Sequence, residues 1–159
     1  MMILKIMPKC YKRFELRSRI RLTYVFAAFM AFFVGIAIYV FFRNHKILLF
    51  QIFPKPAVLD LFYYPVRVDS VLMSLFLFNL PDGLWFLSGL LLIRAVWLVH
   101  PKWRVIYACS FGLIALAMEI LQVFANVPGT FDWLDIVFMA LFSYTESAFF
   151  IIAIKRKVL

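Results

Sequence analysis

Three carboxylates lie close together in a strongly apolar part of the chain, and this residue type can transfer protons or bind cations. Glu119 falls inside an apolar run, and Asp132 and Asp135 follow just beyond a short turn containing Pro128 and Gly129. A charged carboxylate near the centre of a lipid bilayer would cost about 2.5–3.5 kcal/mol on insertion scales. We therefore expect Glu119 to be shielded, paired or protonated, and we take these three residues as the first candidates for chemistry.

The composition indicates a membrane protein. The chain has 159 residues, of which 66% are hydrophobic, and this share exceeds that of ordinary soluble domains. A soluble domain of this size could not bury so much apolar surface. We expect an all-α fold, a polytopic membrane helical bundle that forms a single membrane domain over residues 1–159.

Apolar runs of the required length predict about four transmembrane helices. Their expected bounds are 24–42, 83–99, 105–127 and 133–154. The fourth run opens with Asp132 and Asp135, which suit the N-cap and N3 positions of a helix. Asp82, next to Pro81, is expected to cap the second span in the same way.

The basic residues predict the orientation. They gather in the N-terminal segment 1–23, in the turn 100–104 and in the tail 155–157, which four spans would place on one side. The positive-inside rule assigns that side to the cytoplasm. We thus expect a multi-pass protein of the cytoplasmic (inner) membrane with both termini cytoplasmic. The same placement of charge argues against a nucleic acid as the partner.

The connection 43–81 is too long for a hairpin turn and too apolar for a solvated loop. We expect short interfacial or re-entrant segments on the outer face, one of them a short helix capped by Asp69 or Ser70 and ending near Pro81. The alternative is a single longer second helix that is kinked at Pro81.

Glu119 belongs to a polar stripe on the third span. Small and polar residues recur there at spacings of three and four, which places them on one helix face: Gly112, Ala115, Glu119, Gln122 and Asn126. The opposite face carries Leu113, Leu116, Ile120 and Phe124. We expect the polar stripe to face protein or a wet cleft, either as a functional site or as a polar seam that holds helices together.

Together these residues predict a polar pocket in the outer half of the membrane, formed by Glu119, Gln122, Asp132, Asp135 and Asp82. A separate structural ion pair between Arg94 and Glu146 is expected in the inner half, with snorkelling of Arg94 to the interface as the alternative. No His/Cys cluster has metal-ligand spacing and no nucleophile motif is present, so we expect no metal, no cofactor and no catalytic residue.

Two motifs carry a resemblance to a known family. Glu119-x-x-Gln122 followed by Phe131-Asp132-x-x-Asp135 resembles the signature of VanZ-like membrane proteins, and Asn79 to Ile93 is similar to the middle of some members. Met139 and Phe142 stand where that pattern often has an Asn and a Gly. The resemblance implies a multi-span bacterial membrane protein of a family linked to resistance to the glycopeptide teicoplanin.

The expected function is binding of an envelope component or amphiphile, such as a lipid-linked molecule, at the outer face of the membrane. An acidic pocket would favour a cationic or hydrogen-bond-donating ligand. One alternative is a proton- or cation-coupled small transporter subunit that uses Glu119 as the carrier. Others are a membrane enzyme with paired carboxylates and a scaffold subunit, in either of which an oligomer would be compatible with the sequence.

Overall fold

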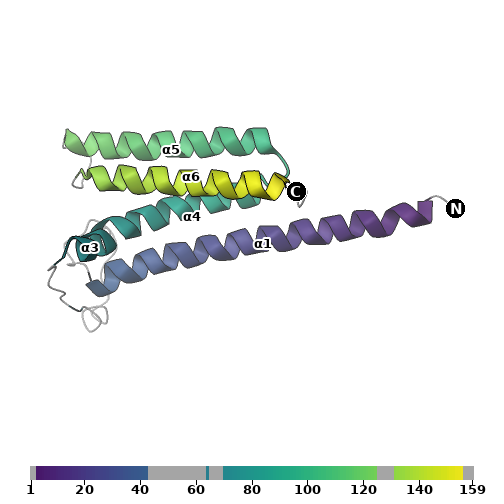
Figure 1. The fold of residues 1–159 in the computed structure, drawn as a ribbon, viewed down its shortest axis with the longest axis horizontal. Coiled ribbons are helices and arrows are strands. Elements are labelled where there is room, and N and C mark those ends of the chain that lie inside the picture. Colours follow the sequence, from purple (N-terminus) through teal and green to yellow (C-terminus); the bar gives the residue numbers. More distant parts are fainter. Residues whose placement is uncertain (1–2, 43–63, 65–69, 125–130, 156–159) are drawn as a thin grey trace, which may run out of the picture.

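The computed structural model describes residues 3–42, 64, 70–124 and 131–155, and these residues form an all-helical bundle (Figure 1). The helices are long and apolar enough to cross a membrane at Glu15–Phe42, Val71–Val96 and Pro101–Val123. A further apolar helix begins at Trp133. Many large apolar side chains are exposed on the bundle, as expected for helices whose outer surface meets lipid rather than water.

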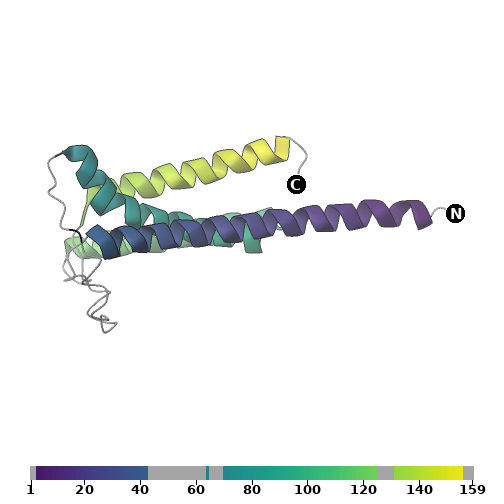
Figure 2. The ribbon, with the colours of Figure 1, turned by 90° about the horizontal axis from the view of Figure 1, so that it is seen from below.

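The first helix, α1, runs from Ile3 to Phe42. Its 40 residues correspond to about 60 Å at about 1.5 Å per residue, roughly twice the thickness of the hydrocarbon core. The helix therefore starts well before the expected span at residue 24, and its N-terminal part projects beyond the other helices (Figures 1 and 2).

The second apolar helix is longer than the expected span 83–99. It consists of α3 (Val71–Ser74), the π-helical turn η2 (Leu75–Asn79) and α4 (Leu80–Val96). The Ser70 side chain caps its start by accepting a hydrogen bond of 3.2 Å from the backbone N–H of Met73. The alternative of one longer helix is therefore correct for residues 71–81, and the separate helix ending near Pro81 is wrong. The rest of the connection, apart from Tyr64 and Ser70, lies outside the described residues.

The π turn explains how a helix continues through Pro81. A proline ring collides with the carbonyl four residues earlier and offers no N–H for the helical ladder. In η2 the turn is widened, and the N–H of Leu80 bonds to the carbonyl of Leu75, five residues back. Pro81 itself is almost fully buried at the second position of α4.

Two further helices complete the bundle. Pro101–Val123 forms α5 and Trp133–Lys155 forms α6. Helix α5 thus begins and ends four residues before the expected span 105–127, so Glu119 lies about 6 Å rather than about 12 Å from the end of its helix.

Helix α4 is the central helix of the bundle. It contacts α1, α5 and α6, whereas α1 contacts neither α5 nor α6 within the described residues. Aromatic rings pack on glycines at each seam: Trp85 lies against Gly35 of α1, Phe142 of α6 against Gly83, and Phe111 of α5 against Gly89. All four long helices have one end in common, where α1 and α5 end and α4 and α6 begin (Figure 1). We call it the carboxylate end, and the opposite end the basic end.

Candidate functional site

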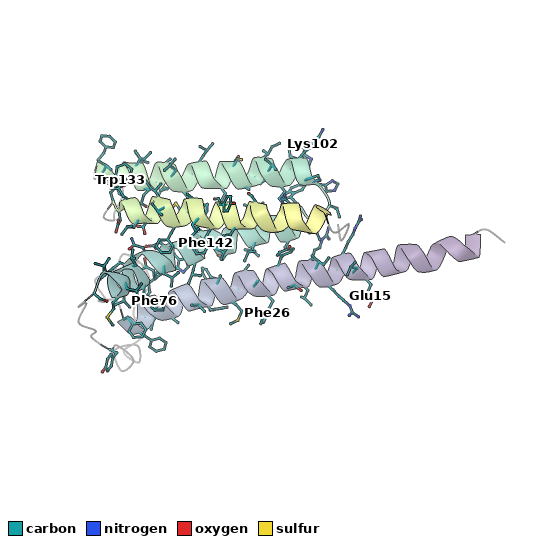
Figure 3. The ribbon with its side chains drawn as sticks, in the orientation of Figure 1. Glu15, Phe26, Phe76, Lys102, Trp133 and Phe142 are labelled. Atoms are coloured by element: carbon teal, nitrogen blue, oxygen red, sulfur yellow. The ribbon has the colours of Figure 1, made fainter. Side chains whose placement is uncertain are left out.

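The first turn of α6 holds two carboxylates at the carboxylate end. Asp132 caps the helix, because its Oδ1 accepts a hydrogen bond of 2.9 Å from the backbone N–H of Leu134. Asp135 follows in the first turn and is 8% exposed. The predicted roles of both residues at the helix start fit this geometry, and the positive end of the helix dipole favours negative charge there. Figure 3 shows Trp133, the residue after the cap, at this end of α6.

Asn79 joins the two carboxylates to the second helix. Its Nδ2 donates hydrogen bonds of 2.8 Å to Oδ2 of Asp132 and 2.9 Å to Oδ1 of Asp135. The side chain is almost fully buried at 2% exposure, and it is the last residue of the π turn. Sequence reasoning did not single out Asn79 as a site residue. The one available signal was an amide inside an apolar helix, two residues before Pro81.

Glu119 approaches the same group from α5. Its carboxyl group accepts a hydrogen bond of 3.2 Å from the backbone N–H of Asp132, and the residue is 6% exposed. On the opposite face of the helix Leu113 is 67% and Phe124 is 66% exposed. The expected division of α5 into a protein-facing polar stripe and an exposed apolar face agrees with these values.

Asp82 links the group to α1. Its Oδ1 accepts a hydrogen bond of 2.6 Å from the hydroxyl of Tyr39, whose ring stacks on Trp85 at a centroid distance of 4.9 Å. The expectation that Asp82 caps the second span is wrong, because the helix already continues from Val71 and leaves no free N–H groups at this point. Asp82 is instead half-buried between helices.

We call Asp82, Glu119, Asp132 and Asp135, with Asn79 between them, the carboxylate cluster. Asp82 and Asp132 interact electrostatically with both Glu119 and Asp135, and all of these interactions are repulsive. The printed donors that offset this repulsion are neutral groups: the Tyr39 hydroxyl, the Asn79 amide and two backbone N–H groups. Such a cluster is suited to accept a cation or a hydrogen-bond donor, because positive charge relieves the mutual repulsion.

The remaining predicted site residues are placed differently. Gln122 is half-buried on α5, and no hydrogen bond joins it to the cluster within the described residues. Arg94 is 1% exposed, with its guanidinium carbon 4.7 Å from the centroid of the Tyr24 ring, so it does not snorkel out of the bundle. The predicted ion pair with Glu146 involves a side chain outside the described residues.

Within the part of the chain that the structure describes, no group of three or more His, Cys, Asp or Glu residues could hold a metal ion. We therefore consider organic cations and hydrogen-bond donors as ligands of the carboxylate cluster.

We compared the chain with protein-family models, with curated proteins and with solved structures, and none of them matches. The argument about function therefore depends on the geometry of the cluster and on the two sequence motifs.

Proposed function

We propose that this chain is a VanZ-like integral membrane protein that binds an envelope component or amphiphile at the outer face of the bacterial cytoplasmic membrane. The ligand is cationic or rich in hydrogen-bond donors, and the carboxylate cluster receives it. The observation that carries this proposal is the convergence of four carboxylates from α4, α5 and α6 at one end of an apolar bundle.

The motif residues support the assignment because they meet in space. Glu119 of the first motif contacts Asp132 of the second, and Asn79 contributes the amide that holds Asp132 and Asp135. These contacts cross up to 56 residues of sequence. A motif whose members are brought together by the fold is better explained by a shared task than by three separate local roles.

One departure from the family pattern has a structural counterpart. Phe142 stands where the pattern often has Gly, and its ring packs against Gly83 on α4. Here the glycine of the facing helix leaves room for the aromatic ring, so close approach of α4 and α6 is kept.

The distribution of basic residues supports the orientation. Arg17, Arg19, Arg21 and Lys102 belong to the end of the bundle opposite the carboxylate cluster. By the positive-inside rule the basic end is cytoplasmic, so the cluster opens toward the outer face.

The proposal is tested by purifying the protein in native lipid particles and measuring by mass spectrometry which amphiphiles copurify. We expect Glu119→Gln and Asp135→Asn to lower the amount of at least one copurifying amphiphile by tenfold or more on order of magnitude. The matched control is Glu15→Gln, which removes a carboxylate from an exposed ion pair with Arg19 outside the cluster. Identical amphiphile profiles for all of these variants would contradict the proposal.

A second candidate function is proton or cation transport with Glu119 as the carrier. It is favoured by one observation, the burial of Glu119 on an apolar helix. Intramembrane carboxylates often act as proton relays. Liposomes containing the protein and a pH-sensitive dye separate the two functions. Proton flux that is lost in Glu119→Gln would favour transport, and flux equal to that of empty liposomes would favour binding.

A further inference from the structure

The face of α1 that packs on α4 continues beyond the end of α4. Tyr24, Ala28, Gly35 and Tyr39 recur at helical spacing on this face: Ala28 is 1% and Tyr39 is 5% exposed, and Gly35 and Tyr24 contact α4 directly. The two helices run antiparallel, since Tyr39 meets Asp82 near one end and Tyr24 meets Arg94 near the other.

Arg21 and Arg17 extend the same stripe at spacings of three and four residues. Arg17 lies about 10 Å beyond the level of Tyr24, whereas α4 continues only about 3 Å beyond Arg94 before it ends at Val96. The two arginines are therefore placed past the last turn of α4, on the side of α1 that faces the connection to α5.

That connection adds charge and aromatic surface at the same end of the bundle. Lys102 and His100 are exposed, and Figure 3 shows Lys102 at the start of α5. Trp97 stacks on Tyr107 at a centroid distance of 5.0 Å, and Trp103 lies beside both rings with 51% of its surface exposed. Tryptophan and tyrosine are typical of the headgroup level of a bilayer.

The cations at this end differ in whether they are already engaged. Arg19 is bonded to Glu15 at 2.7 Å, and Arg94 and Arg104 are buried and interact within the bundle. Among the described residues no carboxylate pairs with Arg17, Arg21 or Lys102.

We propose that the basic end binds the phosphate groups of anionic phospholipids, with Arg17, Arg21 and Lys102 as the contacting side chains. Guanidinium groups bind phosphate oxygens with two parallel hydrogen bonds, and each basic residue near an anionic leaflet adds to the attraction. This surface selects negatively charged phospholipids over zwitterionic ones, which is more than the orientation signal requires. It lies at the opposite end from the carboxylate cluster and does not depend on the function proposed for it.

The test uses the purified full chain in detergent and native mass spectrometry, with phosphatidylglycerol and phosphatidylcholine as probes. We expect tighter binding of phosphatidylglycerol, weakened roughly fivefold by Arg17→Gln and by Arg21→Gln. Arg19→Gln changes the net charge by the same amount but removes a guanidinium that is already paired, so its effect should stay below about twofold.

Two further variants guard against misfolding. Arg21→Lys keeps the charge and should retain the preference for phosphatidylglycerol. Lys102→Gln is a single exposed change on α5 and should weaken binding roughly fivefold without altering thermal unfolding. Equal binding of the two lipids by the unmodified chain would overturn the proposal, and so would an equal loss in Arg17→Gln, Arg21→Gln and Arg19→Gln.

Discussion

One amide nitrogen of Asn79 donates to both Asp132 and Asp135, residues 53 and 56 positions further along the chain. This contact fixes the start of α6 against the π turn before α4. Both acceptors are carboxylates, and hydrogen bonds to charged groups are worth about 1.5–3 kcal/mol each.

Replacing Asn79 by Ala should therefore destabilise the protein by about 2–4 kcal/mol, because two carboxylates lose their donor in a buried setting. The measurement is thermal or denaturant unfolding in detergent. The double variant Asn79→Ala/Asp135→Asn should be less destabilised than the sum of the single variants, with a coupling of about 0.5–3 kcal/mol. Strict additivity would show that the two side chains do not depend on each other.

Replacing Tyr39 by Phe removes the hydroxyl that donates to Asp82 at 2.6 Å but keeps the ring that stacks on Trp85. We expect a loss of about 1–3 kcal/mol in stability, since a carboxylate loses a short hydrogen bond. Tyr24→Phe is the matched control, because the Tyr24 ring contacts Arg94 through its face and Phe retains that interaction. Equal stability of Tyr39→Phe and the unmodified chain would mean that water replaces the hydroxyl at no cost.

The α1/α4 seam should not tolerate a methyl group at Gly35. A Cβ there would lie 2.6 Å from Nε1 of Trp85 and 3.3 Å from the carbonyl oxygen of Pro81. Overpacking of this kind costs about 1–3 kcal/mol. At Gly112 the nearest atom would be Cζ of Phe86 at 3.9 Å, so Gly112→Ala should be neutral or stabilising by up to about 1 kcal/mol. Similar melting temperatures for both variants would argue against a tight seam.

The proposed orientation places residue 18 in the cytoplasm and residue 129 outside. In a background without Cys10 and Cys109, a membrane-impermeant thiol reagent should label Gly129→Cys in intact cells. Ser18→Cys, on an exposed position of α1, should be labelled only after lysis. The reverse pattern would place the carboxylate cluster on the cytoplasmic side and remove the outer-face function.

The helices and the local roles of the α6 carboxylates could be predicted from the sequence, because both follow from short-range patterns. Apolar runs indicate the helices, and an Asp before an apolar run favours an N-cap. The burial of Glu119 followed from the spacing of the polar stripe on α5. The continuation of a helix through Pro81 was only the alternative, since proline usually ends a helix and a π turn leaves no distinct pattern in sequence.

The contacts of Asn79 and of the pair Tyr39–Asp82 could not be predicted in this way. Each joins residues more than 40 positions apart, and helical periodicity carries no information about which helices become neighbours. Asp82 was assigned to a helix cap for the same reason, since its sequence neighbours suggested a helix start while its actual partner lies on α1.

The central position of α4 has a consequence for the order of assembly. During synthesis α1 enters the bilayer before α4 exists, so its packing face, with Gly35 and Tyr39, meets lipid first and exchanges lipid for Trp85 and Asp82 only later. Docking of α1 is therefore a late event onto a nascent α4–α5–α6 unit. Two co-expressed pieces, 1–66 and 67–159, should accordingly recombine in the membrane and copurify through a tag on either piece. If they stay apart, the covalent connection itself is needed to bring α1 to its place.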